Sequence, residues 1–294
     1  MTLKINFFGA SVTQQKEGYA SIFKKNNPGI ECSIFGYGGN HISGAGICYL
    51  DEILMNKPEF LILDWFSTGY CKESNLEKVK IFIDTILYKT IKAGVRPVLL
   101  FLPQKKTPRV LYEYLKQYIN NFNVPVIDID LKLNGRDDIL RDTVHTNQLG
   151  SHLYADELTK SLYLIANENR NSFIIPDRNK YCEIKKIKIY KKIHSNLTLE
   201  GNAEIIGIDQ TVGPYTGYVR IGNYLENLWD RWCYFERNMF HMNFNIEGMK
   251  LIEVLQDDFD RSAAEIQFNW PNEKLLNLST LYYSGDFVKI LDQN

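Results

Sequence analysis

Two short segments, far apart in the chain, contain the residue types of nucleophilic catalysis. Near the amino terminus an apolar run ends at Gly9-Ala10-Ser11, and much later the chain reads Asp142-Thr143-Val144-His145. A serine hydroxyl is a poor nucleophile at neutral pH unless a neighbouring base takes its proton. A histidine can act as that base, and a carboxylate can hold the histidine ring in the required orientation. If the two segments meet in the fold, Ser11, His145 and Asp142 predict serine-dependent acyl transfer.

Each of these residues also has a simpler interpretation. A serine that follows a strand often caps a helix, and an aspartate can do the same. A histidine in a late loop can be an ordinary surface residue. The presence of all three in this order favours the catalytic interpretation.

The first 170 residues alternate between strand and helix patterns, which predicts a parallel sheet with helices on both faces. The predicted strands are 3–8, 31–35, 60–63, 97–102 and 124–129, and the predicted helices are 19–25, about 75–93, 107–122 and about 148–167. We therefore expect an α/β domain over residues 1–172, with a flavodoxin-like, doubly wound parallel sheet of five strands. Ligands of such sheets bind beyond the carboxyl ends of the strands, where Ser11, Gly38-Gly39 and Ser67-Thr68 should lie.

The pattern changes after about Phe173, and Pro176-Asp177 marks the predicted domain boundary. Residues 177–294 contain short strand patterns separated by turn residues, which predicts an antiparallel β-sandwich or jelly roll. The predicted strands are 182–190, 197–208, 217–221, 232–235, 242–246 and 264–268. We expect this domain to bind carbohydrate or to support oligomerisation. Its aromatic residues fit either the core of a sandwich, which is the commoner use of such residues, or a sugar-stacking platform; they are Tyr215, Tyr218, Trp229, Trp232 and Tyr234.

Composition excludes several classes of partner. The 294 residues are 45% hydrophobic and 23% charged with a net charge of −1, which gives no general attraction to nucleic acid or to an anionic membrane. No apolar stretch approaches the roughly 20 residues that span a bilayer, and the first residues enter a strand pattern without a signal-peptide core. The five cysteines are scattered, which is typical of reduced thiols in a cytoplasmic protein. No metal-ligand spacing occurs, so we expect neither a metal nor a cofactor. A homo-oligomer is compatible with the sequence.

The two segments resemble conserved blocks of a known family. Gly9-Ala10-Ser11-Val12-Thr13 is similar to the first block of the SGNH, or GDSL-like, hydrolase superfamily, and Asp142-Thr143-Val144-His145 is similar to its last block. The resemblance covers roughly residues 1–170, including the order of the blocks and the strand–helix alternation. It implies that Ser11 is the nucleophile, His145 the general base and Asp142 the residue that orients the base.

The resemblance also implies donors for the oxyanion of the tetrahedral intermediate. The Ser11 amide is one candidate, and the second family block would supply a glycine amide, for which Gly39 is the best match and Gly38 an alternative. The third family block normally supplies an asparagine, but this chain reads Leu63-Asp64-Trp65-Phe66-Ser67-Thr68 there. Thr68 takes the position of the asparagine, with Ser67 beside it, and Asn40 is another candidate donor.

The resemblance implies a serine-dependent ester hydrolase that acts on O-acyl groups, chiefly O-acetyl groups of a carbohydrate or surface polysaccharide. Its substrate would be a small-molecule or glycan ester. The same three residues could pass the acyl group to a sugar hydroxyl, which would make the protein an O-acyltransferase. The altered third block favours a further alternative, a non-catalytic glycan-binding protein that retains the fold.

Overall fold

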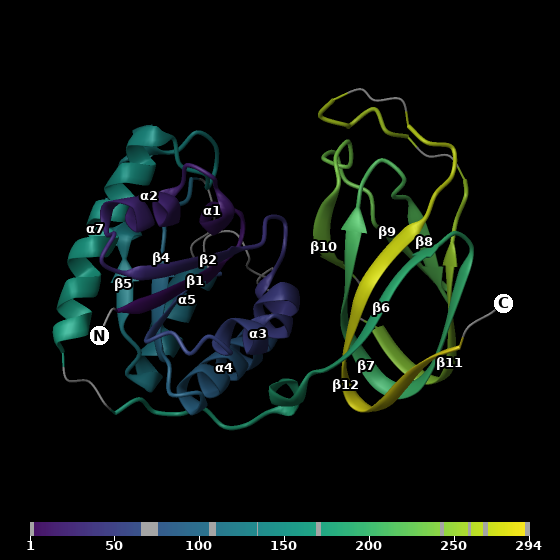
Figure 1. Ribbon diagram of the computed structural model, residues 1–294, viewed down its shortest axis with the longest axis horizontal. Coiled ribbons are helices and arrows are strands. Elements are labelled where there is room, and N and C mark those ends of the chain that lie inside the picture. Colours follow the sequence, from purple (N-terminus) through teal and green to yellow (C-terminus); the bar gives the residue numbers. More distant parts are fainter. Residues whose placement is uncertain are drawn as a thin grey trace. The chain divides into compact units, whose positions relative to one another are not determined.

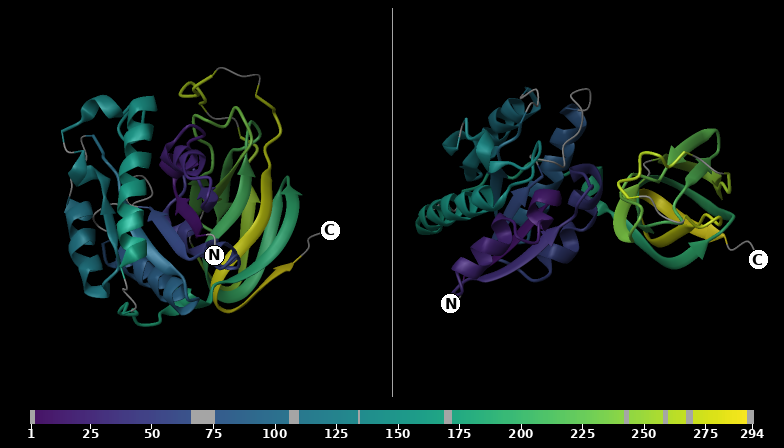
Figure 2. Two further views of the ribbon diagram at one scale, coloured as in Figure 1. Left: turned by 60° about the vertical axis from the view of Figure 1, so that its left-hand side comes forward. Right: turned by 90° about the horizontal axis from the view of Figure 1, so that it is seen from above.

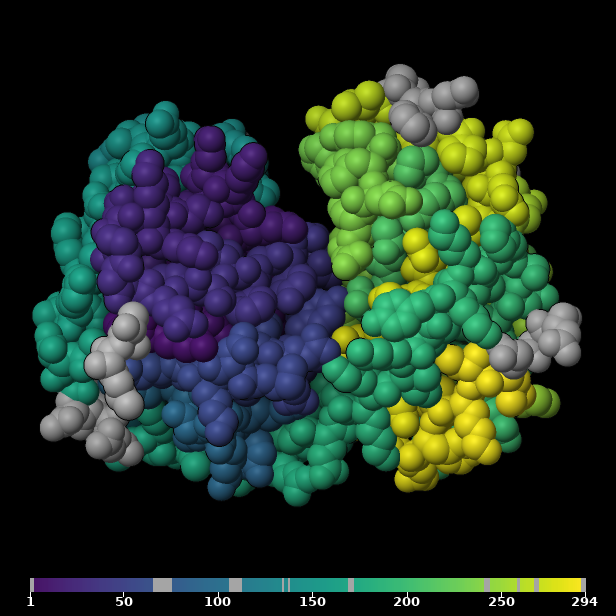
Figure 3. All heavy atoms as spheres, viewed as in Figure 1, coloured from purple at the N-terminus to yellow at the C-terminus, as the bar shows by residue number. Residues whose placement is uncertain are grey.

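The computed structural model describes residues 3–65, 76–105, 110–133, 135–168, 172–241, 244–257, 260–266 and 270–291. The chain divides into two compact units, Met1–Cys182 and Glu183–Asn294, and each is described by itself. The boundary predicted at Pro176-Asp177 lies a few residues before this division. In each unit, side chains fill the space between the ribbons of Figure 1, as the space-filling view in Figure 3 shows.

A parallel sheet with strand order β2-β1-β3-β4-β5 forms the centre of the first unit (Figure 1). Its five strands, among the residues described, are β1 (Lys4–Gly9), β2 (Glu31–Gly36), β3 (Phe60–Asp64), β4 (Arg96–Phe101) and β5 (Val126–Asp128). The chain moves outward from β1 to β2 and then returns to the other side of β1 with β3. The doubly wound sheet predicted from the sequence is confirmed, and the carboxyl end of β1 lies where the strand order reverses, which is the usual ligand position in such sheets.

Helices cover both faces of this sheet, as the views in Figure 2 show. The α-helices are α1 (Ser11–Gln14), α2 (Tyr19–Asn26), α3 (Leu50–Leu54), α4 (Leu76–Lys92), α5 (Val110–Ile119), α6 (Ile129–Lys132) and α7 (Gln148–Asn167). Single turns of other helix types occur at Ile42–Gly46, Asn120–Phe122 and Asp137–Ile139. The predicted helix 148–167 coincides with α7, whereas the predicted strand 124–129 is shorter, because Ile129 already begins α6. No helix in the described part of the chain combines the length and apolar character needed to cross a membrane.

The alternation of side chains along β1 explains why its sequence is almost wholly apolar. Phe7 packs against α2, with its ring centroid 6.0 Å from that of Tyr19 and 5.4 Å from that of Phe23. Phe8 points to the opposite face, 5.0 Å from the ring of Trp65. A central strand of a doubly covered sheet must present apolar side chains to both faces, and β1 does so up to the turn that carries Ser11.

Gly9 at the end of β1 has no room for a side chain. A Cβ atom there would lie 2.4 Å from Thr13 Oγ1 and 2.5 Å from the backbone oxygen of Asp64. We expect Gly9→Ala to lower the free energy of unfolding by about 1–3 kcal/mol, the usual cost of overpacking a close contact. Gly29→Ala is the matched control, because a Cβ at Gly29 meets nothing within 4 Å. Urea unfolding of both variants tests this, and a Gly9→Ala protein as stable as the Gly29→Ala protein would contradict it.

The second unit is antiparallel, as the sequence predicts. Its described strands form one hydrogen-bonded sheet of seven strands in the order β6-β12-β7-β11-β8-β9, with β10 paired to β7. The strands are β6 (Lys185–Ile193), β7 (Asn196–Val212), β8 (Tyr218–Ile221), β9 (Tyr224–Asn227), β10 (Arg237–His241), β11 (Phe244–Val254) and β12 (Leu276–Leu291). A 3₁₀ turn, Lys180–Glu183, precedes them. The sheet curls in Figure 1 around a core of aliphatic side chains such as Leu199, Ile205 and Leu281.

Two strand predictions in this unit are wrong. Residues 232–235 form a turn, because the side chain of Asp230 accepts hydrogen bonds that curl the chain, including one of 2.8 Å from the amide of Trp232. Residues 264–266 are not a strand either, since the amide of Ala264 bonds back to the Arg261 carbonyl at 2.9 Å; residues 267–268 lie outside the described part. The five aromatic residues predicted as platform or core are only partly buried, and Trp232 is 42% exposed.

Candidate active site

Ser11 is the first residue of α1, two residues after the end of the central strand β1. The turn is tied to the neighbouring strand, because the amide of Ala10 donates to the backbone oxygen of Asp64 at 3.3 Å. Thr13, two positions further into α1, donates from Oγ1 to Asp64 Oδ2 at 2.9 Å and contacts the Tyr19 hydroxyl at 2.9 Å. Thr13, Tyr19 and Asp64 are fully buried. Burial and the nearby Asp64 carboxylate raise the pKa of Tyr19 well above its ordinary value, which keeps the phenol neutral.

Asp142 and His145 lie in a tight loop that precedes α7. The base of this loop is closed by an antiparallel bridge between Leu140 and Thr146 and by a hydrogen bond of 2.9 Å from the Arg141 amide to the His145 carbonyl. Lys105 holds the loop from another side: its amide donates to the Thr143 carbonyl at 2.8 Å, and its Nζ donates to the Leu140 carbonyl at 3.0 Å. The loop therefore keeps its shape through backbone contacts on both sides of His145.

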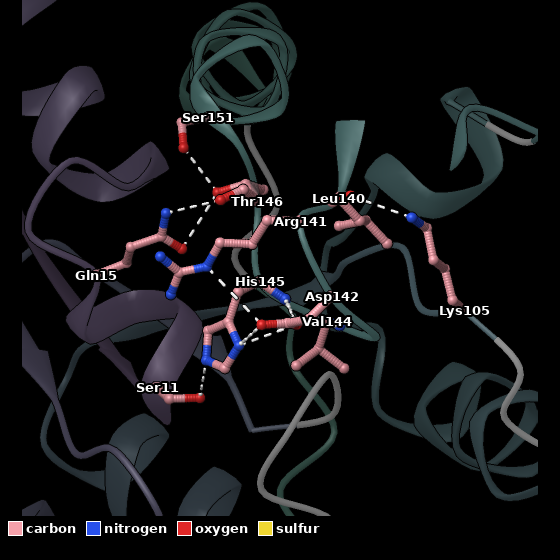
Figure 4. Close-up of polar contacts among 10 residues, drawn as sticks. All are labelled: Ser11, Gln15, Lys105, Leu140, Arg141, Asp142, Val144, His145, Thr146 and Ser151. Carbon is pink, nitrogen blue, oxygen red and sulfur yellow. Dashed lines mark hydrogen bonds and ion pairs between the residues drawn. The ribbon is translucent and has the colours of Figure 1, made fainter. Parts of the chain in front are cut away.

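The structure brings the three sequence-predicted residues into direct contact (Figure 4). His145 Nε2 lies 2.8 Å from Ser11 Oγ, and His145 Nδ1 lies 2.9 Å from Asp142 Oδ2 and 3.1 Å from Asp142 Oδ1. This arrangement suits the tautomer in which Nδ1–H donates to the carboxylate and Nε2 accepts from the serine hydroxyl. The His145 side chain is 25% exposed, so solvent and substrate can reach the pair. Such a geometry can activate a serine hydroxyl for attack on a carbonyl.

Asp142 is held as a carboxylate by its own loop. Partial burial opposes its ionisation, but Oδ1 accepts hydrogen bonds from the amides of Val144 at 3.0 Å and His145 at 2.8 Å, and the His145 ring adds a further bond. These bonds outweigh burial and place the pKa of Asp142 below its ordinary value of 3.8. Arg141 is close as well, with Nε 3.8 Å from Asp142 Oδ2.

A pH dependence follows from this lowered pKa. A carboxyl group whose folded pKa is below its unfolded pKa stabilises the fold fully above the unfolded value, and the stabilisation is lost as the pH falls through the folded value. We expect the contribution of Asp142 to be complete well above the unfolded value of about 4 and to be lost progressively as the pH falls from there through the lower folded pKa. Carboxyl ¹³C NMR titration of the folded protein measures the midpoint. A midpoint at or above the ordinary value of 3.8 would contradict this prediction.

The glycine-rich loop after β2 approaches Ser11. A Cβ atom on Gly38 would lie 3.7 Å from the Ser11 Cβ, and the Gly38 amide donates to Gln14 Oε1 at 2.7 Å. Gly39 has a φ of +74°, which favours glycine at this turn. Asn40 is buried, and its side-chain amide donates to the Gly38 carbonyl at 3.1 Å. The loop residue nearest to Ser11 in these contacts is therefore Gly38, and the Asn40 side chain stabilises the loop through its hydrogen bond to Gly38. That Gly39 or Asn40 donates a hydrogen bond to the oxyanion stays a prediction.

Ser67 and Thr68, the candidate replacements for the family asparagine, lie outside the described residues. Sequence reasoning missed two glutamines close to Ser11. Gln14 Oε1 accepts a hydrogen bond from the Gly38 amide. Gln15 binds Thr146, the residue that follows His145. Their position directly after Gly9-Ala10-Ser11-Val12-Thr13 was the only available signal for them.

Comparison with known proteins gives similarity at the level of structure. No family model matches the chain, and no curated protein matches it by sequence. A two-domain esterase active on acetylated mannans is similar in structure over 97% of this chain and 92% of its own, with a TM-score of 0.65 and 14% identity. Two smaller proteins are also similar. A putative lipolytic protein of the G-D-S-L family from Desulfitobacterium hafniense DCB-2 has a TM-score of 0.48 and 18% identity, over 54% of this chain and 98% of its own. A psychrotrophic esterase from Pseudoalteromonas sp. has a TM-score of 0.47 and 19% identity, over 56% of this chain and 99% of its own.

The similarity to the two-domain esterase extends over both units of this chain, and at 14% identity it is a similarity of fold. The strand order of the first unit agrees with the fold that the first and last sequence blocks predict. The chain therefore has a doubly wound α/β unit followed by an antiparallel β unit, and over nearly its whole length it shares the fold of a two-domain esterase.

Proposed function

We propose that this protein is a serine-dependent esterase that removes O-acetyl groups from a carbohydrate, with Ser11, His145 and Asp142 as its catalytic triad. One observation carries the proposal: Ser11 Oγ lies 2.8 Å from His145 Nε2 while His145 Nδ1 lies 2.9 Å from an Asp142 oxygen. A serine, an imidazole and a carboxylate joined in this order have the geometry of a general-base-activated nucleophile. A glycan-binding protein would have no use for that order of contacts.

The proposed reaction proceeds in two steps. Ser11 Oγ attacks the ester carbonyl while His145 Nε2 takes the hydroxyl proton, and the tetrahedral intermediate collapses as His145 returns that proton to the departing sugar oxygen. Water then attacks the acetyl-serine while His145 takes one of its protons; His145 returns that proton to Ser11 Oγ as the acyl bond to Ser11 breaks, and acetate leaves. Asp142 remains ionised throughout and stabilises the imidazolium form of His145, in keeping with its lowered pKa.

The proposed substrate class rests on the similar fold. The solved esterase with which this chain shares its fold is described as active on acetylated mannans, and it was also crystallised with mannopentaose. At 14% identity this similarity of fold supports acetylated glycans as the first substrates to test.

Purified full-length protein tests the proposal with p-nitrophenyl acetate, p-nitrophenyl octanoate and acetylated manno-oligosaccharides, each with and without free sugar as an acceptor. We expect acetate release from the glycan and faster turnover of the acetyl ester than of the octanoyl ester. Transfer of acetyl to the added sugar, detected by mass spectrometry, would identify an O-acyltransferase instead. Failure to turn over any donor would favour the glycan-binding alternative.

A further inference from the structure

We propose that Gln15 is a positioning residue that sets the distance between Ser11 and His145; this inference rests on the proposed function of that pair. Gln15 follows directly after α1, the helix that begins with Ser11, and its own backbone is already extended, with φ −54° and ψ 120°. Its side chain thus leaves the end of the nucleophile helix and reaches a residue 131 positions later in the chain.

Both ends of the Gln15 amide bind the same residue. Nε2 donates to the Thr146 carbonyl at 2.9 Å, and Oε1 accepts from Thr146 Oγ1 at 3.3 Å. Figure 4 shows the amide facing Thr146 with both contacts drawn. A two-point contact fixes orientation as well as distance, since rotation of the amide would break both bonds at once.

The hydroxyl groups behind Thr146 complete the network. Thr146 Oγ1 lies 2.6 Å from Ser151 Oγ, in α7, and both residues are buried. Thr146 has a single hydroxyl proton, which it donates to Gln15 Oε1; Ser151 must therefore donate to Thr146. Ser151 in α7 therefore donates to Thr146, and Thr146 donates to Gln15. These two hydrogen bonds join the segment after Ser11 to the helix that follows His145.

A contact to Thr146 can position His145 because of the place of Thr146 in the loop. It directly follows His145 and forms the bridge with Leu140 that closes the loop base. Holding Thr146 therefore holds the base from which the His145 ring projects. The Ser11–His145 hydrogen bond of 2.8 Å is partly exposed, and a displacement of about 1 Å at such a contact can reduce a rate 100-fold.

The test compares Gln15→Met with Gln256→Met in the full chain. Methionine keeps the length of the side chain and removes the amide. Gln256, in the second unit, is a matched control: its Nε2 donates to the carbonyls of His194 at 2.8 Å and Lys274 at 2.9 Å, and its Oε1 accepts from the Lys274 amide at 2.9 Å. We expect Gln15→Met to lower kcat on p-nitrophenyl acetate by about 10- to 100-fold with KM within about twofold of wild type, and Gln256→Met to leave kcat unchanged. A Gln15→Met kcat within about twofold of wild type, or an equal loss in both variants, would overturn the proposal.

Variants of Thr146 add a graded test. Thr146→Ser keeps both groups that Gln15 binds and should retain the wild-type kcat, whereas Thr146→Val keeps only the carbonyl and should lose several-fold. In the Gln15→Met background the Thr146→Val change should cost much less, because the contact is already absent. Equal costs in the two backgrounds would overturn the proposal.

A second readout separates failure of this inference from failure of the proposed function. The ring ¹⁵N shift of His145 Nε2 reports its hydrogen bond to Ser11 whether or not the protein hydrolyses esters. We expect this shift to change in Gln15→Met and to remain as in wild type in Gln256→Met. If wild-type protein turns over no ester, the proposed function fails, and the shift alone decides: a change confined to Gln15→Met supports the positioning role, and an unchanged shift overturns it.

Discussion

Replacing Ser11 with alanine should reduce ester hydrolysis by about four to six orders of magnitude, the loss seen when a serine nucleophile is removed from a triad. In the proposed mechanism the Ser11 hydroxyl forms the acyl-enzyme, and its oxygen lies 2.8 Å from His145 Nε2. Release of p-nitrophenol from p-nitrophenyl acetate measures the loss. Covalent labelling by an organophosphonate, followed by mass spectrometry, measures the nucleophile directly and should disappear in the same variant.

Ser21→Ala is the control for this experiment. Ser21 lies in α2, ten positions after Ser11, and is not the serine that contacts His145. Alanine suits a helix at least as well as serine does. Its activity and labelling should match wild type. Activity of Ser11→Ala above about 1% of wild type, with unchanged folding, would contradict the assignment of Ser11 as nucleophile.

The first unit could be predicted well because its signals are local. An apolar run ending at glycine marks β1, and the helix predicted at 148–167 is α7, at whose start the Asn147 side chain accepts from the Gly150 amide at 2.9 Å. Parallel strands bring their carboxyl ends to one edge, which predicts Ser11 at that edge, and the family resemblance predicts that His145 joins it. Neither step required knowledge of a distant contact.

The second unit was less predictable because long-range pairing overrides local preference. β12 runs from Leu276 to Leu291 although it contains residues typical of turns, including Ser284-Gly285-Asp286. Register shifts against β7, one of them between Gly285 and Phe287, absorb these residues within the strand. Conversely, the aromatic segment 232–235 has strand-forming side chains but is held as a turn by Asp230. Whether such a segment becomes a strand or a turn depends on a partner strand or on a capping side chain. Neither can be recognised from a short stretch of sequence.

The supporting contacts of the candidate site were also beyond sequence reasoning. Gln15 is a common residue in a polar stretch, and its role depends on Thr146 being brought within 2.9 Å by the fold. Asp64 falls in the altered third block, where the sequence suggested only a missing asparagine. In the structure this carboxylate is buried beside the turn that carries Ser11 and accepts from Thr13. Residue type alone could not separate these anchors from ordinary surface polar residues.

Asp142→Asn should lower kcat by about 100- to 10,000-fold while the loop keeps its shape. An asparagine Oδ1 can still accept from the amides of Val144 and His145, which lie 3.0 and 2.8 Å from the present oxygen. The neutral amide, however, cannot stabilise an imidazolium, and its NH₂ group facing Nδ1 would favour the tautomer with the proton on Nε2, where it blocks acceptance from Ser11. Asp138→Asn is the matched control, because Asp138 is an exposed carboxylate four positions earlier that pairs with Arg136.

The pair of variants separates the catalytic interpretation from the structural one. If Asp142 served only to shape its loop, Asp142→Asn would lose little activity, since the amide contacts survive, and both variants would resemble wild type. If Asp142 orients the His145 ring and stabilises its imidazolium form, only Asp142→Asn lowers kcat. KM then changes little, because the substituted group does not touch the substrate. The loss should persist across the pH range in which Asp142 is ionised, because its pKa lies below 3.8 and its charge is present throughout. An equal kcat for Asp142→Asn and Asp138→Asn would show that the Asp142 carboxylate takes no part in catalysis. The catalytic group would then be a serine–histidine pair.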